Sequence, residues 1–149
     1  HQIGGVIVIG RQTKASLARL AAVAIWADEK LEPEEIESAR EMARALGMAW
    51  GGFRTALMAG IEALMSDLDR EGESIADVIG QIYLEDGVDP LEVLGCLVRI
   101  VVSDNRVTLR ELEVVHGVAD ALRIPPILVT QAIVSEVAPV VSGVARREN

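Results

Sequence analysis

Two short acidic segments carry the residue types that could hold a metal ion. In each segment an Asp is followed by an aliphatic residue three positions later and by a Glu seven positions later. These residues are Asp28, Leu31 and Glu35 in the first segment and Asp104, Val107 and Glu111 in the second. A hard divalent cation takes several oxygen ligands, and a loop that runs into a helix can supply carboxylates from both. We therefore expect calcium or another divalent cation, with these candidate ligands: Asp28, Glu32, Glu35, Asp104, Asn105 and Glu111.

The same residues also have an explanation that needs no metal. Their spacing matches only the second half of a calcium-binding EF-hand loop, because the two leading ligand positions fall on side chains without oxygen. Those positions are Ala24 and Trp26, or Ile100 and Val102. An Asp in a turn bonds to nearby backbone amides, and a Glu at the third position of a helix accepts from the amide of the capping residue. Helix capping and cation binding therefore both stay open.

The sequence gives little support for enzymatic chemistry. Glu113 and His116 form an E-x-x-H pattern, but di-iron bundles need two such motifs, and the repeat of this one has Arg40 in place of the histidine. We expect His116 to be partly buried and hydrogen-bonded locally. The sequence contains no nucleophile elbow, phosphate-binding loop or dinucleotide fingerprint. The chain is therefore expected not to be an enzyme.

An internal repeat places the two acidic segments in equivalent positions. The constant offset that carries Asp28 onto Asp104 aligns the two segments without a gap, and it also aligns four apolar pairs that follow them. The pairs are Ile36 with Leu112, Ala39 with Val115, Ala43 with Ala119 and Leu46 with Leu122. Their spacing of three, four and three positions is that of the apolar face of a helix. Each repeat unit therefore consists of a helix, an acidic loop and a helix, over about residues 13–48 and 89–124.

The helices on either side of each loop have recognisable patterns. Before the loops, helices are expected over about 13–27 and 89–103. The second of these is apolar nearly all round and belongs at the centre of a bundle. After the loops, Pro33 at a first helical position and the capping box of Thr108 with Glu111 begin two more helices.

Three further helices complete the expected architecture. Apolar stripes predict helices around 57–68 and 75–83, and a last helix begins near Pro125. We expect an all-α bundle of about seven helices with a pseudo-twofold repeat and no strand, in a single domain over residues 13–149. The apolar segment 1–12 has two open interpretations, a packed arm or the trimmed edge of a membrane anchor.

Charge and cysteine content narrow the class of protein. The formal net charge is -9 and no basic stripe is present, so nucleic acid is not expected as a partner. The single cysteine, Cys96, cannot form an internal disulfide and lies in an apolar run, where we expect a buried, inert thiol. This fits a reducing compartment such as the cytoplasm.

The two acidic segments, with the helices that follow them, resemble the tellurite-resistance TerB-like family. The family signature is Ala or Ser, then Asp, Gly, any residue and an aliphatic residue, followed by a helix that has an early Glu and ends in Leu-Gly. The first copy resembles it over 27–35 and 43–47, and the second over 103–111 and 121–124. The likeness spans roughly residues 13–137. Two positions depart from it, since Glu29 and Asn105 stand where the family usually has Gly.

The resemblance implies a seven-helix pseudo-twofold bundle whose acidic loops are proposed to bind divalent metal. It also implies a role in stress or tellurite resistance, often in membrane-associated assemblies, and the same domain occurs in J-domain co-chaperones of the DjlA type. We therefore expect a cytoplasmic, non-catalytic module with a protein partner, for which membrane association and a homodimer stay open. The alternative is a metal-independent interaction or scaffold domain, with Trp50 and Phe53 as exposed candidates on its surface.

Overall fold

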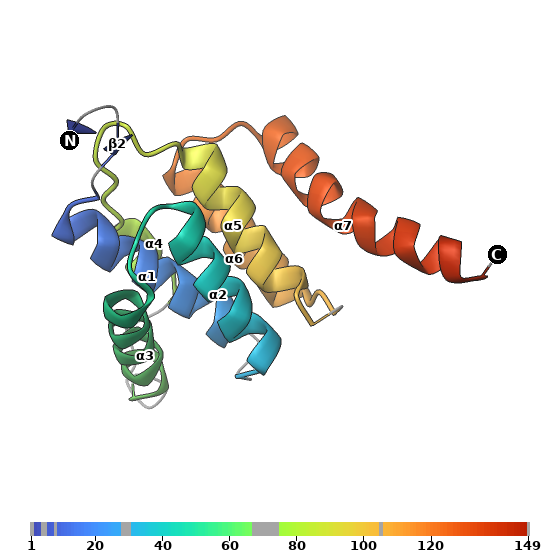
Figure 1. The fold of residues 1–149 in the computed structure, drawn as a ribbon, viewed down its shortest axis with the longest axis horizontal. Helices are drawn as coiled ribbons and strands as arrows, with labels where there is room; N and C mark the ends of the chain where they lie inside the picture. The colour runs from blue at the N-terminus through green and yellow to red at the C-terminus, as the bar shows by residue number, and fades with distance from the viewer. Residues whose placement is uncertain are drawn as a thin grey trace.

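The computed structural model describes residues 2–3, 6–7, 9–27, 31–66, 75–104 and 106–148. Within these ranges the chain forms seven helices and one short hairpin, so the expected all-α bundle is confirmed (Figure 1). The elements are β1 (Gln2–Ile3), β2 (Val6–Ile7), α1 (Arg11–Trp26), α2 (Pro33–Ala45), α3 (Trp50–Ser66), α4 (Ile75–Gly80), α5 (Pro90–Val102), α6 (Leu109–Ala121) and α7 (Pro126–Glu148). Among the helices described, none combines the length and the hydropathy needed to cross a bilayer.

The expectation that the chain has no strand misses one short hairpin near its beginning. Strand β1 pairs antiparallel with β2, and each has two residues. Val and Ile favour extended backbone. After the hairpin, Ile9 packs against the core and Gly10 N donates a hydrogen bond to Glu85 Oε1 at 2.8 Å. The hairpin is too short to change the fold class.

Two central helices, α1 and α5, form the interior of the bundle. From Leu17 to Ile25 every residue of α1 except Arg19 is at most 1% exposed. The apolar residues of α5 from Val93 to Val101 are buried as well, which confirms the central position predicted for this helix. The same depth of burial in α1 was not predicted, because many of its buried residues are alanines, which give only a weak apolar pattern in the sequence. A helix buried all round has to be covered by other helices on every side.

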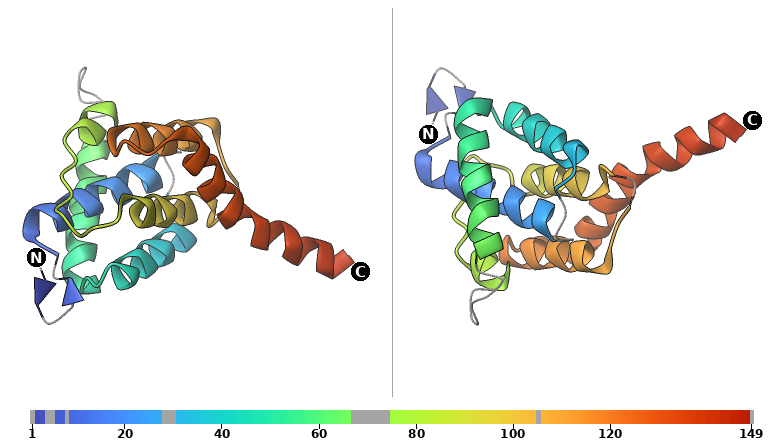
Figure 2. Two further views of the ribbon diagram at one scale, coloured as in Figure 1. Left: turned by 90° about the horizontal axis from the view of Figure 1, so that it is seen from above. Right: turned by 90° about the horizontal axis from the view of Figure 1, so that it is seen from below.

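The two repeat units provide that cover by exchanging equivalent contacts. Helix α2 of the first unit packs on α5, while α6 of the second unit packs on α1. Within each half of the chain, α3 lies against α1 and the first part of α7 lies against α5 (Figures 1 and 2). The repeat offset relates Pro33 to Leu109 at the starts of α2 and α6, and Trp50 to Pro126 at the starts of α3 and α7. This reciprocal pattern is that of the predicted pseudo-twofold repeat.

The C-terminal ends of α2 and α6 carry the same backbone motif. Met48 N donates to Ala43 O at 2.7 Å, and Ile124 N donates to Ala119 O at 2.8 Å. Both ends are Schellman motifs, which require one residue in the left-handed region. In α2 that residue is Gly47, with φ of 74°, whereas in α6 it is Arg123, with φ of 59°. A side chain at Cβ makes this backbone conformation costly, so the second copy of the motif is the strained one.

We therefore predict that Arg123→Gly stabilises the protein. Removing Cβ relieves the left-handed conformation, and the gain in the free energy of unfolding should be about 1 kcal/mol. The reciprocal change, Gly47→Arg, should lower the stability by a similar amount. Urea unfolding followed by circular dichroism measures both. A loss of stability in Arg123→Gly would show that the arginine side chain makes contacts that outweigh the backbone strain.

Candidate functional site

Two buried carboxylates occupy equivalent positions at the entrances to α2 and α6. Glu35 and Glu111 are each the third residue of their helix, and each is 1% exposed. Glu111 Oε1 accepts a hydrogen bond from Thr108 N at 2.9 Å, and Thr108 Oγ1 accepts one from Glu111 N at 3.1 Å. In the first copy Glu35 Oε1 accepts from Glu32 N at 3.2 Å. The predicted capping box at Thr108 is confirmed, and both carboxylates stabilise the start of a helix.

The other candidate metal ligands are only partly placed. Asp104 is half-buried, and its Oδ1 accepts a hydrogen bond from Arg106 N at 3.1 Å, as in a turn stabilised by an aspartate. Glu32 is half-buried at the position before α2. Asp28 and Asn105 lie outside the residues that the structure describes. Within the described ranges, no group of three or more His, Cys, Asp or Glu side chains is arranged so that it could hold a metal ion.

The described carboxylates alone do not fit a calcium ion. Two of the three candidate ligands of each loop lie among the described residues, and one of those two already accepts a hydrogen bond from a helix-capping amide. Calcium takes roughly six to eight oxygen ligands. Cation binding at the loops therefore stays a prediction, which a titration has to decide.

Two expectations about surface residues are wrong. His116 is exposed rather than partly buried, because it lies on the face of α6 that points away from the core. Phe53 is fully buried and Trp50 is half-buried, with their ring centroids 6.1 Å apart, so the pair is part of the packing of α3. The exposed apolar side chains include the equivalent loop residues Leu31 and Val107, which are 46% and 43% exposed.

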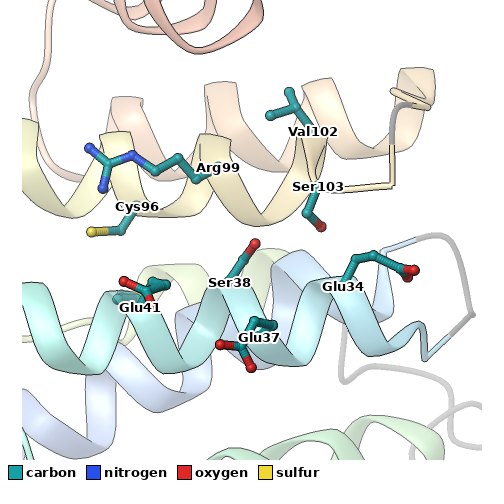
Figure 3. Close-up of a pocket in the computed structure, with 9 residues that line it drawn as sticks. Glu34, Glu37, Ser38, Glu41, Cys96, Arg99, Val102 and Ser103 are labelled. Carbon is teal, nitrogen blue, oxygen red and sulfur yellow. The ribbon is translucent and has the colours of Figure 1, made fainter. Parts of the chain in front are cut away.

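A groove of about 480 Å³ runs between α2 and α5. Its lining residues come from these two helices and the residue that follows α5: Glu34, Glu37, Ser38, Glu41, Met42, Cys96, Arg99, Val102 and Ser103. Ser38 points toward α5, while Cys96 and Ser103 point toward α2 (Figure 3). Met42 and Cys96 are buried in the floor of the groove. The groove therefore combines an apolar floor with polar walls.

The α2 wall of this groove is acidic. Glu34, Glu37 and Glu41 are spaced by three and four positions, so they form one stripe along the helix, and all three are exposed. The opposite wall has one basic residue, Arg99, whose Nε lies 2.9 Å from Glu136 Oε1 of α7. This hydrogen bond to Glu136 raises the pKa of Arg99, and the Arg99 side chain extends along α5 (Figure 3). The groove thus has three exposed carboxylates and one cation that is already paired.

The thiol in the floor of the groove is held in its neutral form. Burial raises the pKa of Cys96, and the nearby carboxylates Glu92 and Glu136 raise it further against the opposing effect of Arg99. Only the thiolate is a good nucleophile or metal ligand, so a raised pKa makes Cys96 unreactive near neutral pH. The expectation of a buried thiol is confirmed.

The sequence did not point to this groove. The carboxylates of α2 have the spacing of an ordinary solvated helix face, and Cys96 has the surroundings of a core residue. Only the packing of α2 on α5 brings the acidic stripe beside the apolar floor. Comparison of the chain with protein-family models, with curated proteins and with solved structures finds no match.

We predict that the buried carboxylate of α6 stabilises the fold through its capping bond. Glu111→Ala removes the acceptor for Thr108 N, and the free energy of unfolding should fall by about 1 to 2 kcal/mol. Glu111→Gln keeps an acceptor oxygen and should lose less. The matched control is Glu113→Ala, an exposed position of the same helix, where a change within about 0.5 kcal/mol is expected. Thermal or urea unfolding of the three variants tests this, and equal effects at 111 and 113 would contradict it.

Proposed function

We propose that this chain is a non-catalytic helical module that binds a protein partner in the groove between α2 and α5. The observation that supports the proposal is the composition of the groove, an apolar floor beside an exposed acidic wall. Apolar surface that is rimmed by polar side chains is typical of protein interaction sites. The groove is open along the surface, which suits a polypeptide better than a small molecule enclosed on all sides.

The chemistry of the groove favours binding over catalysis. The strongest type of nucleophile in its lining is the thiol of Cys96, and a buried thiol with a raised pKa is a poor nucleophile. Catalytic cysteines have lowered pKa values and a base within hydrogen-bond reach. Among the described lining residues, Ser38 and Glu41 lie on α2, across the groove from Cys96, and no hydrogen bond joins either of them to the thiol (Figure 3).

We also propose that the module is of the TerB-like kind. Support comes from the two helix–loop–helix units at one constant offset, each with a buried Glu at the third position of its second helix. On this proposal the protein acts in the cytoplasm in a stress or tellurite-resistance process, and any membrane association runs through the assembly that it joins. A homodimer is compatible with the proposal but is not needed for it.

A photo-crosslinking experiment tests the binding groove. With p-benzoylphenylalanine at Ser38, we expect a covalent adduct with one defined protein in cells that produce the chain. The same residue at Glu62, exposed on α3, should give no such adduct. Val102→Trp should fill the groove and abolish the adduct at position 38, while circular dichroism confirms that the variant is folded.

The captured protein then has to bind in purified form. We expect it to bind the unmodified chain and to bind Val102→Trp at least about tenfold more weakly, because an interface depends on a few central residues. Equal crosslinking from positions 38 and 62, or equal affinity of the two purified proteins, would contradict a role for the groove.

Cation binding at the acidic loops is the second candidate function. The observation in its favour is that a buried carboxylate and a half-buried Asp, Glu111 and Asp104, belong to one loop and the helix that follows it. Few protein ligands imply weak binding, with a Kd of about 10⁻⁴ to 10⁻³ M for calcium.

Calcium-titration calorimetry decides the second candidate. We expect binding heat for the unmodified chain and a reduced heat for Asp104→Ala. The control is Asp120→Ala, an exposed acid of α6 outside the loop, whose titration should match the unmodified chain. If neither the unmodified chain nor the control gives heat, the loops have a capping role only.

A further inference from the structure

The open groove has a counterpart in the other half of the bundle. The repeat offset carries its α2 wall onto α6, so that Glu41 corresponds to Gly117 and Met42 to Val118. It carries the α5 wall onto α1, so that Cys96 corresponds to Leu20 and Arg99 to Val23. The counterpart groove therefore lies between α6 and α1, two helices that also contact each other, although less extensively than α2 contacts α5.

A short helix of the chain itself covers this counterpart groove. Helix α4 contacts both α1 and α6, and it lies on the side of the bundle away from α2 (Figure 2). Its Ile79 is buried, and a Cβ added at Gly117 would lie 3.4 Å from Ile79 Cδ1. The segment that follows is fixed to α1, since Tyr83 N donates to Ser16 Oγ at 3.0 Å. In the covered groove, Gly117 therefore stands where the open groove has Glu41, and Ile79 packs over this glycine.

The exposure of equivalent residues reflects this difference. Val23 in the covered groove is fully buried, whereas the side chain of its equivalent, Arg99, is 50% exposed. Ala27 is likewise fully buried, and its equivalent Ser103 is only half-buried. The fold therefore contains two equivalent helix pairs, one with a third helix packed on it and one on which none of the described helices is packed in that place.

We infer that the groove between α2 and α5 receives a short amphipathic helix with a basic outer edge, supplied by a partner protein. In the covered groove the equivalent helix pair binds α4, a short helix that packs Ile75, Val78 and Ile79 against the core. This inference rests on the proposed function and specifies the partner. Helix α2 packs more extensively on α5 than α6 does on α1. Because α2 and α5 are already in close contact, the incoming helix would bind on the surface of this pair and would not insert between the two helices.

Charge determines the polar side of the incoming helix. In the covered groove the equivalents of Glu34, Glu37 and Glu41 are Arg110, Glu113 and Gly117, so only one of the three positions is acidic. The open groove instead presents Glu34, Glu37 and Glu41 along one edge. Lys or Arg side chains at the edge of a bound helix would lie beside this stripe, while its aliphatic side chains cover the half-buried Val102. Complementary charge of this kind selects a basic partner over an acidic one.

Fluorescence anisotropy with two model peptides tests the inference on the full chain. Both peptides are long enough for about four helical turns and share one Ile and Leu face, and they differ in carrying Lys or Glu on the flanking positions. We expect the Lys peptide to bind at least about tenfold more tightly than the Glu peptide. The triple variant Glu34→Lys, Glu37→Lys, Glu41→Lys should lose this preference. Its control is Glu62→Lys, Asp86→Lys, Asp120→Lys, which makes the same change in net charge at exposed sites elsewhere.

A third variant separates docking in the groove from general attraction to an acidic protein. Val102→Trp fills the groove without changing charge and should weaken binding of the Lys peptide at least about tenfold. Unchanged binding in Val102→Trp, or equal loss in the two triple variants, would overturn the inference. So would a dimer of the chain that sedimentation detects and that Val102→Trp abolishes, because the occupant would then be a second copy.

The two proposals can fail separately. If crosslinking from Ser38 captures a partner that Val102→Trp releases, while neither model peptide binds, the groove is a binding site but its occupant is not a basic helix. If the crosslinking result itself is negative, the proposed function fails whatever the peptides do.

Discussion

The need to cover α1 and α5 determines the rest of this structure. Both helices are apolar around nearly their whole circumference, and such helices are stable in water only inside a bundle. Neither repeat unit can cover its own central helix alone. The units therefore interlock, with α6 on α1 and α2 on α5, while α3 and α7 close the outer sides. The pseudo-twofold repeat is a consequence of two equal units that bury each other's exposed apolar surface.

The cover is complete on one side of the bundle and incomplete on the other. Helix α4 finishes the burial of α1, but no described helix occupies the equivalent place on α5. The floor formed there by Met42 and Cys96 is sealed mainly by the close packing of α2, whose outer stripe is acidic. A binding surface can arise in this way without any specialised loop, wherever a duplicated fold fills only one of two equivalent grooves.

The acidic loops show how one set of residues can serve structure and binding chemistry at once. Glu35 and Glu111 are buried, and a buried carboxylate is tolerated only when its oxygens are satisfied. The amides of Glu32 and Thr108 meet part of that need, and in doing so they fix where α2 and α6 begin. A cation would have to compete for or share the same oxygens. Capping is therefore part of the fold, and cation binding would be an addition to it.

The sequence alone determined the helical class, the two repeat units, the capping box at Thr108 and the burial of Cys96. Each of these depends on contacts within a few residues or on a periodic pattern, which a single chain displays directly. It gave the wrong environment for His116 and Phe53, and it missed the hairpin, the full burial of α1 and the groove. Whether Glu37 and Glu41 belong to an ordinary solvent-exposed helix face or to the wall of a groove depends on which helix packs beside α2. That choice is made between residues far apart along the chain, where no local pattern records the contact, so only the tertiary structure decides it.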